Sequence, residues 1–98
     1  MYTSYVIEGL SGFDWDAGNV GHILLHGVLP VEVEAAVNGN CIIVPASAVN
    51  REERWKLFAR TGERYLVVVF TIRLNLFRAI TAYDMPKKER ELYASQID

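Results

Sequence analysis

Residues 54–82, RWKLFARTGERYLVVVFTIRLNLFRAITA, decide the fold of this 98-residue chain. The first part alternates between apolar and largely polar side chains, as strands do, and turn residues follow at 61–63 and 73–75. Between the turns, residues 65–72 are largely β-branched and apolar on both faces. The stretch therefore predicts a meander of three antiparallel strands. Its central strand is covered on both faces, or covered on one face and dimerised through the other.

A short strand and two helices are predicted before the meander. Residues 4–8 indicate the strand. Asp16 can cap a helix over residues 17–25, because its carboxylate can accept hydrogen bonds from the first-turn amides. Gly27 suits the left-handed residue that ends this helix, and Pro30 suits the first turn of a second one.

The remaining segments complete the predicted element order. Residues 38–40 indicate a turn and are the expected loose stretch. The short apolar run of residues 41–44 and then residues 45–47 follow it, and no element is assigned to them. Asp84 can cap a last helix that has Pro86 in its first turn. The order β-α-α-β-β-β-α predicts one α+β domain over residues 1–98, with helices packed on one face of an antiparallel sheet.

Charge is divided unevenly between the two halves of the chain. Residues 1–50 contain five acidic residues and no Lys or Arg, whereas residues 51–98 contain all ten basic residues and seven acidic ones. The second half is thus expected to present a basic surface, which suits a nucleic acid or an acidic partner.

The sequence also excludes several classes of protein. A lone Cys41 cannot form an internal disulfide, so a reducing cytoplasm is the expected location. The first residues lack the basic and apolar regions of a signal peptide, and the longest apolar run is too short to span a bilayer. No motif for zinc, nucleotide hydrolysis or a serine nucleophile occurs, so no metal or cofactor is expected.

A series of short motifs resembles the BrnT family of bacterial toxins, in the order typical of that family. They are Phe13-Asp14-Trp15-Asp16, Gly18-Asn19, His26-Gly27-Val28, Glu52-Glu53-Arg54-Trp55, Arg60-Thr61, Arg78-Ala79-Ile80-Thr81-Ala82 and Met85-Pro86-Lys87-Lys88-Glu89-Arg90 leading to Tyr93. The resemblance implies a RelE-like fold and a metal-independent endoribonuclease toxin of a type II toxin–antitoxin system. The implied partners are an RNA substrate, a BrnA-like ribbon-helix-helix antitoxin, and a second copy of the toxin within the complex.

RNA cleavage without a metal ion uses the 2′-hydroxyl of the RNA as nucleophile, and it requires proton transfer and cations near the phosphate. On the strand prediction, Arg54, Lys56 and Arg60 share one face, and Arg78 can join them across the sheet. Arginine can donate two hydrogen bonds to a phosphate, so this face is a candidate phosphate site. A merely solvated sheet face is the alternative.

The resemblance adds further candidate residues. Arg60 and Arg78 are the expected contacts of the transition state, and His26 and Glu53 are candidate acid–base or orienting groups, while Arg54, Lys56 and Tyr83 are candidate RNA contacts. For His26 and Glu53, a helix-end histidine and a surface carboxylate remain the alternatives. Tyr83 stands where the family commonly has a second arginine, and the first predicted helix lacks Lys and Arg. These departures favour a second hypothesis, a catalytically weak member that acts as a partner-binding module.

Overall fold

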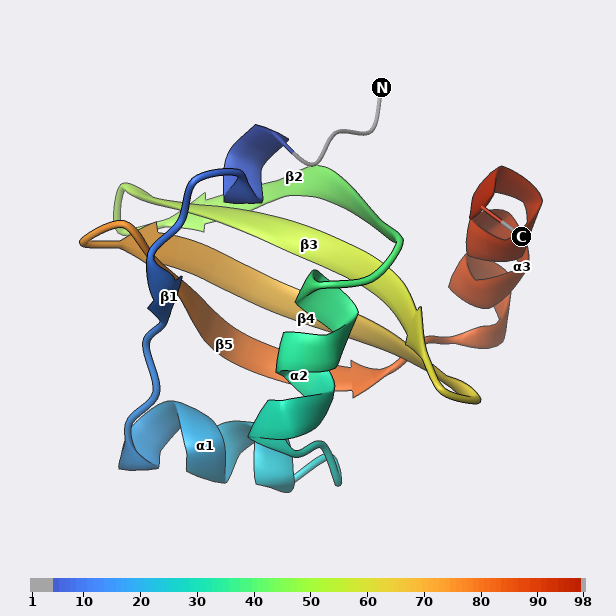
Figure 1. The fold of residues 1–98 in the computed structure, drawn as a ribbon, viewed down its shortest axis with the longest axis horizontal. Helices are drawn as coiled ribbons and strands as arrows, with labels where there is room; N and C mark the ends of the chain where they lie inside the picture. Colours follow the sequence, from blue (N-terminus) through green and yellow to red (C-terminus); the bar gives the residue numbers. More distant parts are fainter. Residues whose placement is uncertain (1–4, 98) are drawn as a thin grey trace.

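The computed structural model describes residues 5–97, which form three α-helices and five β-strands (Figure 1). The elements, in chain order, are a 3-10 helix (Tyr5–Ile7), β1 (Gly12–Phe13), α1 (Ala17–Leu24), α2 (Pro30–Val37), β2 (Cys41–Val49), β3 (Glu52–Thr61), β4 (Arg64–Arg73), β5 (Leu76–Asp84) and α3 (Lys87–Ile97). The predicted α+β class and the three-stranded meander are confirmed.

The strands form one sheet in the order β1-β5-β4-β3-β2. Strands β2 to β5 pair antiparallel with their neighbours, whereas β1 pairs parallel with β5. The sheet is therefore mixed, and the prediction of a purely antiparallel sheet is corrected. Strand β4 occupies the centre of the sheet, as the apolar run predicted.

Two segments differ from the sequence prediction. Residues 41–47, for which the sequence predicts no element, belong to strand β2. Pro45 obscured this strand, but β2 lies at the edge of the sheet, where a residue without an N–H is tolerated. Residues 5–7 of the predicted first strand form a 3-10 helix, and Ser4 lies outside the described residues.

The ends of α1 and α2 follow the predicted local chemistry. The Oδ1 atom of Asp16 accepts a hydrogen bond from the Asn19 amide at 3.0 Å, and the Asn19 side chain accepts one from the Asp16 amide at 2.8 Å. Gly27 has a φ of 71°, the left-handed conformation that a glycine adopts without strain. Pro30 is the first residue of α2, where its missing N–H costs no hydrogen bond.

The helices cover both faces of the sheet, which corrects the prediction of helices on one face. Leu66 and Val68 of β4 pack in the main core with residues of α1 and α2. Val67 lies between them in the sequence and points to the other face, where it packs with Met85 and Tyr93. Figure 1 shows α3 at the end of the sheet away from β1.

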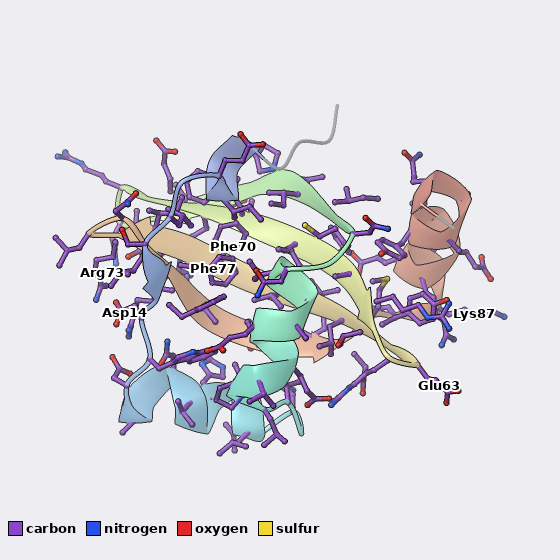
Figure 2. The ribbon with its side chains drawn as sticks, viewed as in Figure 1. Asp14, Glu63, Phe70, Arg73, Phe77 and Lys87 are labelled. Carbon is purple, nitrogen blue, oxygen red and sulfur yellow. The ribbon has the colours of Figure 1, made fainter. Side chains whose placement is uncertain are left out.

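An aromatic stack holds the middle of the main core together. The rings of Phe70 and Phe77 are stacked with 4.2 Å between their centroids, and Figure 2 shows the two side chains next to each other. Trp55 stacks on Phe70, and Phe13 of β1 meets Phe77 edge to face. The stack ties β1, β3, β4 and β5 into one unit, which fixes the strand ends that carry the polar site. None of the helices among residues 5–97 is long and apolar enough to cross a membrane.

Candidate functional site

A row of polar side chains crosses the sheet near the β2–β3 and β4–β5 turns. Thr71 is the register partner of Arg78 on β5. Trp55 of β3 pairs with Phe70 of β4. The residue before Trp55, Arg54, therefore lies opposite Thr71 of β4. Three neighbouring strands therefore present these residues side by side on the face of the sheet that carries α3.

Helix α1 lies beside this row and encloses a polar hollow of about 270 Å³. The hollow is lined by Gly18, Asn19 and His22 of α1, Glu52 and Arg54 of β3, Thr71 and Arg73 of β4, and Arg78, Ala79 and Ile80 of β5. Figure 2 shows that Arg73 and Asp14 lie at one end of the molecule, opposite Glu63 and Lys87. The hollow is thus at the end of the sheet away from the start of α3.

Glu52 holds two of the arginines in the hollow. Its Oε1 atom accepts a hydrogen bond from Arg54 Nε at 3.2 Å, and its Oε2 atom lies 3.6 Å from Arg73 Nη2. The side chain of Glu52 is about one-third exposed, so these contacts are only partly screened by water. Glu52 therefore positions two guanidinium groups and offsets one of their charges.

Two carboxylates hold the third arginine. Arg78 Nη1 lies 2.8 Å from Asp16 Oδ2 and 3.4 Å from Asp14 Oδ1. The hydrogen bond and charge of Asp16, with the charge of Asp14, raise the pKa of Arg78. The hydrogen bond from the Asn19 amide, followed by the contact with Arg78, lowers the pKa of Asp16. Arg78 is therefore a fixed cation at the wall of the hollow.

Buried hydrogen bonds place α1 against the sheet. Asn19 is buried, and its Nδ2 atom donates to the backbone oxygens of Asp14 at 2.9 Å and Ala79 at 3.0 Å. Within the sheet, the buried hydroxyl of Thr71 on β4 donates to the Glu53 carbonyl on β3 at 2.7 Å. These bonds satisfy polar atoms that would otherwise be buried without a partner.

The predicted arginine stripe is divided between two parts of the molecule. Arg54 and Arg78 line the hollow, as the cross-sheet prediction required. Lys56 lies next along the same face of β3 and is half-buried. Arg60 is six residues beyond Arg54, about 20 Å along an extended strand. Its guanidinium lies over the ring of Tyr65, 5.3 Å from the centroid.

The other predicted residues lie outside the hollow. Glu53 is exposed, and strand alternation places its side chain on the face opposite to Arg54. His26 follows the end of α1, and its ring centroid lies 6.3 Å from that of Tyr83 and 6.2 Å from that of His22. Tyr83 packs against the small apolar cluster beneath α3. The structure therefore does not bring Glu53, His26 or Tyr83 together with Arg54 and Arg78.

Five polar residues that line the hollow are not among the predicted site residues: Asn19, His22, Glu52, Thr71 and Arg73. The sequence prediction places Glu52 and Arg73 outside the strands and does not include His22 among the candidates. Extending the alternation of β3 back by two residues from Arg54 would have placed Glu52 on the same face. His22 stands where the resembled family usually has a lysine, but the sequence favours a surface histidine, because its place in the hollow depends on how α1 packs beside β5. Within residues 5–97, no cluster of three or more His, Cys, Asp or Glu side chains could hold a metal ion.

The motif at 13–16 has a structural meaning that its order in the sequence does not reveal. Asp14 and Asp16 hold Arg78, and the indole of Trp15 donates to Glu34 of α2 at 2.9 Å. One short segment thus joins β1, α1, α2 and β5. Through Asp14 and Asp16, this segment fixes the position of Arg78 in the wall of the hollow.

Comparison with known proteins agrees with these features. A family model described as the ribonuclease toxin BrnT of a type II toxin–antitoxin system matches residues 15–89, which is most of the chain. No curated protein and no solved structure matches the chain. The matched range contains all the residues that line the hollow. The chain therefore belongs to the BrnT family of ribonuclease toxins of type II toxin–antitoxin systems.

Proposed function

We propose that this chain is a metal-independent endoribonuclease whose hollow between α1 and strands β3 to β5 is the site of RNA cleavage. The observation that carries this proposal is the meeting of Arg54, Arg73 and Arg78 with His22 in one hollow of a ribonuclease-family chain. The arginines supply fixed positive charge on three neighbouring strands. A phosphodiester is the part of RNA that such a site would bind.

The reaction assigned to this site needs no group beyond the chain and the RNA. The 2′-oxygen forms a bond to phosphorus and loses its proton, while the bond to the 5′-oxygen breaks and that oxygen gains a proton. The products are a 2′,3′-cyclic phosphate end and a free 5′-hydroxyl. Arg54, Arg73 and Arg78 would stabilise the extra negative charge that develops on the phosphate oxygens.

His22 is the candidate for proton transfer in the hollow. Histidine is the side chain that ordinarily gains and loses a proton near neutral pH, so it can act as base and as acid. His22 is exposed on α1 and lines the hollow together with the arginines. It therefore combines access to the RNA with closeness to the proposed phosphate position.

The roles predicted for His26, Glu53 and Arg60 form a separate hypothesis about the same reaction. They require the RNA to extend along β3 beyond the hollow, past Lys56 and toward Arg60. Arg54, Lys56 and Arg60 share one face of the strand, but Phe58 between the last two packs in the cluster beneath α3, so a flexible single strand would have to pass around α3 to reach Arg60. Tyr83 would then contact the RNA only if the RNA passed beneath α3.

The resemblance also supports further parts of the proposal. A BrnA-like ribbon-helix-helix antitoxin would neutralise the chain, and a homodimer would form within the toxin–antitoxin complex. The proposal also includes a RelE-like fold and a cytoplasmic location, where the RNA substrate resides.

A second candidate function is supported by the charge pairing in the hollow. Each arginine there faces a carboxylate: Arg54 and Arg73 face Glu52, while Arg78 faces Asp14 and Asp16. A phosphate must compete with these carboxylates for the guanidinium groups. This arrangement supports a catalytically weak member that binds a partner and does not cleave RNA.

Expression of the chain alone in a bacterium, followed by an RNA cleavage assay in buffer with EDTA, separates the two functions. The ribonuclease proposal expects arrested growth and RNA fragments that end in a 2′,3′-cyclic phosphate. Normal growth and intact RNA would leave the binding-module function. Arg51→Gln is the matched control, because Arg51 is exposed in the β2–β3 turn and outside the hollow.

A further inference from the structure

The carboxylates of the hollow hold their arginines at different distances. Asp16 Oδ2 lies 2.8 Å from Arg78 Nη1, a distance typical of a strong, charge-assisted contact. Glu52 lies farther from its partners. Its Oε1 atom is 3.2 Å from both Nε and Nη2 of Arg54, and its Oε2 atom is 3.6 Å from Nη2 of Arg73. The contacts of Glu52 are therefore looser, and the one with Arg73 is too long for a direct hydrogen bond.

The two carboxylates also differ in what else depends on them. The second oxygen of Asp16 accepts the hydrogen bond from the Asn19 amide that caps α1, so this carboxylate cannot turn away without uncapping the helix. Within residues 5–97, the Glu52 carboxylate forms hydrogen bonds and ion pairs with Arg54 and Arg73 alone. Glu52 can therefore leave its arginines without breaking a further contact of this kind.

Movement of the Glu52 side chain would destabilise the fold only slightly. This side chain is about one-third exposed, and partly exposed ion pairs contribute little net stability because water competes for both groups. The neighbouring backbone is held separately, since the Thr71 hydroxyl donates to the Glu53 carbonyl at 2.7 Å. The Glu52 side chain can thus turn toward solvent while strand β3 stays in place.

The Glu52 carboxylate is placed as a phosphate would be between the same arginines. Its two oxygens face different guanidinium groups, one from β3 and one from β4. A phosphodiester also presents two oxygens that share a negative charge, and arginine binds such oxygens through its planar set of N–H groups. The Arg73 side chain is 54% exposed, so a ligand can reach it from solvent. Arg54 and Arg73 therefore form an anion position that a carboxylate of the chain itself occupies.

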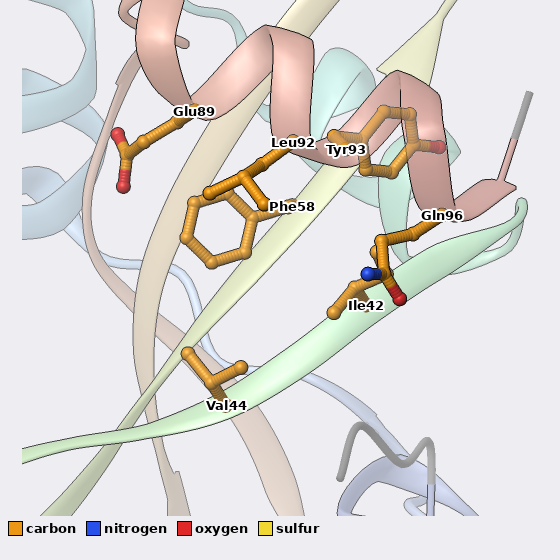
Figure 3. A pocket seen from close by; sticks show the side chains of 7 residues that line it. All are labelled: Ile42, Val44, Phe58, Glu89, Leu92, Tyr93 and Gln96. Carbon is orange, nitrogen blue, oxygen red and sulfur yellow. The ribbon is translucent and has the colours of Figure 1, made fainter.

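A second depression, between α3 and strands β2 and β3, lacks this chemistry. Figure 3 shows Leu92 of α3 lying over the ring of Phe58, with Ile42 and Val44 on the neighbouring strand. None of the described residues that line this depression is basic, and Glu89 among them would repel a phosphate. Of these two depressions, the hollow is thus the one that offers guanidinium groups to an anion.

We propose that Glu52 is a stand-in for a phosphate: a phosphodiester of RNA displaces its carboxylate and binds between Arg54 and Arg73. Before binding, Glu52 keeps the two arginines in place. During binding it competes with the phosphate, so it sets the affinity for RNA. Asp16 stays in place because it also caps α1, which confines the exchange to Glu52. The inference rests on the proposed function in taking RNA as the source of the phosphate.

Binding of a short, fully 2′-O-methylated RNA tests the proposal, because this RNA lacks the hydroxyl needed for cleavage. Fluorescence anisotropy gives its dissociation constant for the unmodified chain and Glu52→Gln at several salt concentrations. Glu52→Gln removes the competing charge and keeps the shape, so binding should become about tenfold tighter at low salt. The slope of log affinity against log salt should steepen by up to about 0.7. If Glu52 only supported the arginines, Glu52→Gln would weaken binding instead.

Glu63→Gln is the matched control, because it removes the same charge at the opposite end of the molecule from Arg73 (Figure 2). Equal gains in affinity from Glu52→Gln and Glu63→Gln would overturn the proposal. In an Arg73→Ala background, Glu52→Gln should give a much smaller gain, because the arginine that it releases is missing. Glu52→Ala is the second variant if Glu52→Gln does not fold, and it should also tighten binding.

Two results separate this proposal from the proposed function. Unchanged or weaker binding of RNA by Glu52→Gln, with binding lost in Arg54→Ala, would overturn the stand-in role and leave the hollow as the RNA site. If no variant binds RNA, inorganic phosphate is the second probe, and its protection of each chain against thermal unfolding is measured. Greater protection of Glu52→Gln would support displacement of Glu52 by phosphate and refute the proposed function. Equal protection would overturn the proposal.

Discussion

Arg78 on β5 and Asp16 at the start of α1 form an ion pair, with 2.8 Å between Nη1 and Oδ2. The other oxygen of the same carboxylate caps α1 through the amide of Asn19. A single side chain therefore fixes both the beginning of a helix and the direction of an arginine in the hollow. Stability and site geometry are coupled at this point.

The first prediction concerns the two roles of Asp16. Asp16→Asn keeps an oxygen that can cap α1 but removes the charge that faces Arg78, whereas Asp16→Ala removes both. We expect the free energy of unfolding to fall from the unmodified chain to Asp16→Asn and again to Asp16→Ala. Urea denaturation at neutral pH measures this order. Identical stabilities of Asp16→Asn and the unmodified chain would mean that the ion pair adds nothing.

The pH dependence of this difference follows from the lowered pKa of Asp16. A carboxyl whose pKa is lower in the folded chain stabilises the fold above its ordinary value of 3.8. That stabilisation is lost as the pH falls through the folded-state pKa, which lies below 3.8. The stability difference between the unmodified chain and Asp16→Asn should thus shrink only in strong acid.

The second prediction separates the hollow from the far end of the arginine stripe. Arg54→Ala should lower the rate of RNA cleavage by about 10²–10³-fold, because it removes a positive charge close to the reacting phosphate. Arg60→Ala changes the same residue type on the same face of β3, and we expect a much smaller loss. Single-turnover cleavage of a short RNA gives both rates. The reverse order would place the chemistry near Arg60, as the family resemblance implied.

The third prediction compares the two histidines of the α1 region. His22→Gln should lower the cleavage rate by about 10²–10⁴-fold, because it removes a group able to transfer a proton. His26 has its ring near that of His22 but does not line the hollow, so His26→Gln is the matched control. The rate is measured across pH. If only His26→Gln loses activity, the role of His22 is refuted.

The fourth prediction concerns Arg64, which joins three parts of the chain. It donates to Asp84 Oδ1 at 2.7 Å, to both oxygens of Glu32 at 3.0 Å and to the Gly27 carbonyl at 2.9 Å. Its side chain is 27% exposed, so water screens these contacts partly, and we expect Arg64→Ala to cost about 1 kcal/mol. Arg51→Ala provides the control in the same urea denaturation experiment. A loss no larger than that of the control would show that the contacts are too screened to matter.

The fifth prediction tests the main core by making the same leucine-to-alanine substitution at a buried and at an exposed position. Leu57 is fully buried, whereas Leu74 is 89% exposed. Leu57→Ala should lower the free energy of unfolding by about 2–5 kcal/mol, because it removes buried methyl groups and leaves a cavity. Leu74→Ala should change it by no more than about 0.5 kcal/mol. Similar losses at both positions would contradict the assigned core.

The candidate site was only partly predictable from the sequence. Arg54 and Arg78 were expected to meet across the sheet, and they do line the same hollow. The sequence predicts Glu53 as the acidic site residue, whereas the adjacent Glu52 faces the arginines. A shift of one residue along a strand moves a side chain to the other face. The predicted strand begins at residue 54, after both residues. A local pattern therefore could not decide between them.

The sequence by itself determined much, but not all, of the local structure of this protein. The cap formed by Asp16, the left-handed Gly27 and the strand and turn pattern of residues 54–82 all act between near neighbours, and each predicted its element correctly. Only the tertiary structure decided that β2 continues through Pro45 at the edge of the sheet, and that α3 covers the face opposite to α1 and α2. It also decided that Asp14 and Asp16 hold Arg78. Such contacts join residues far apart in the chain, and they depend on how whole elements pack against one another.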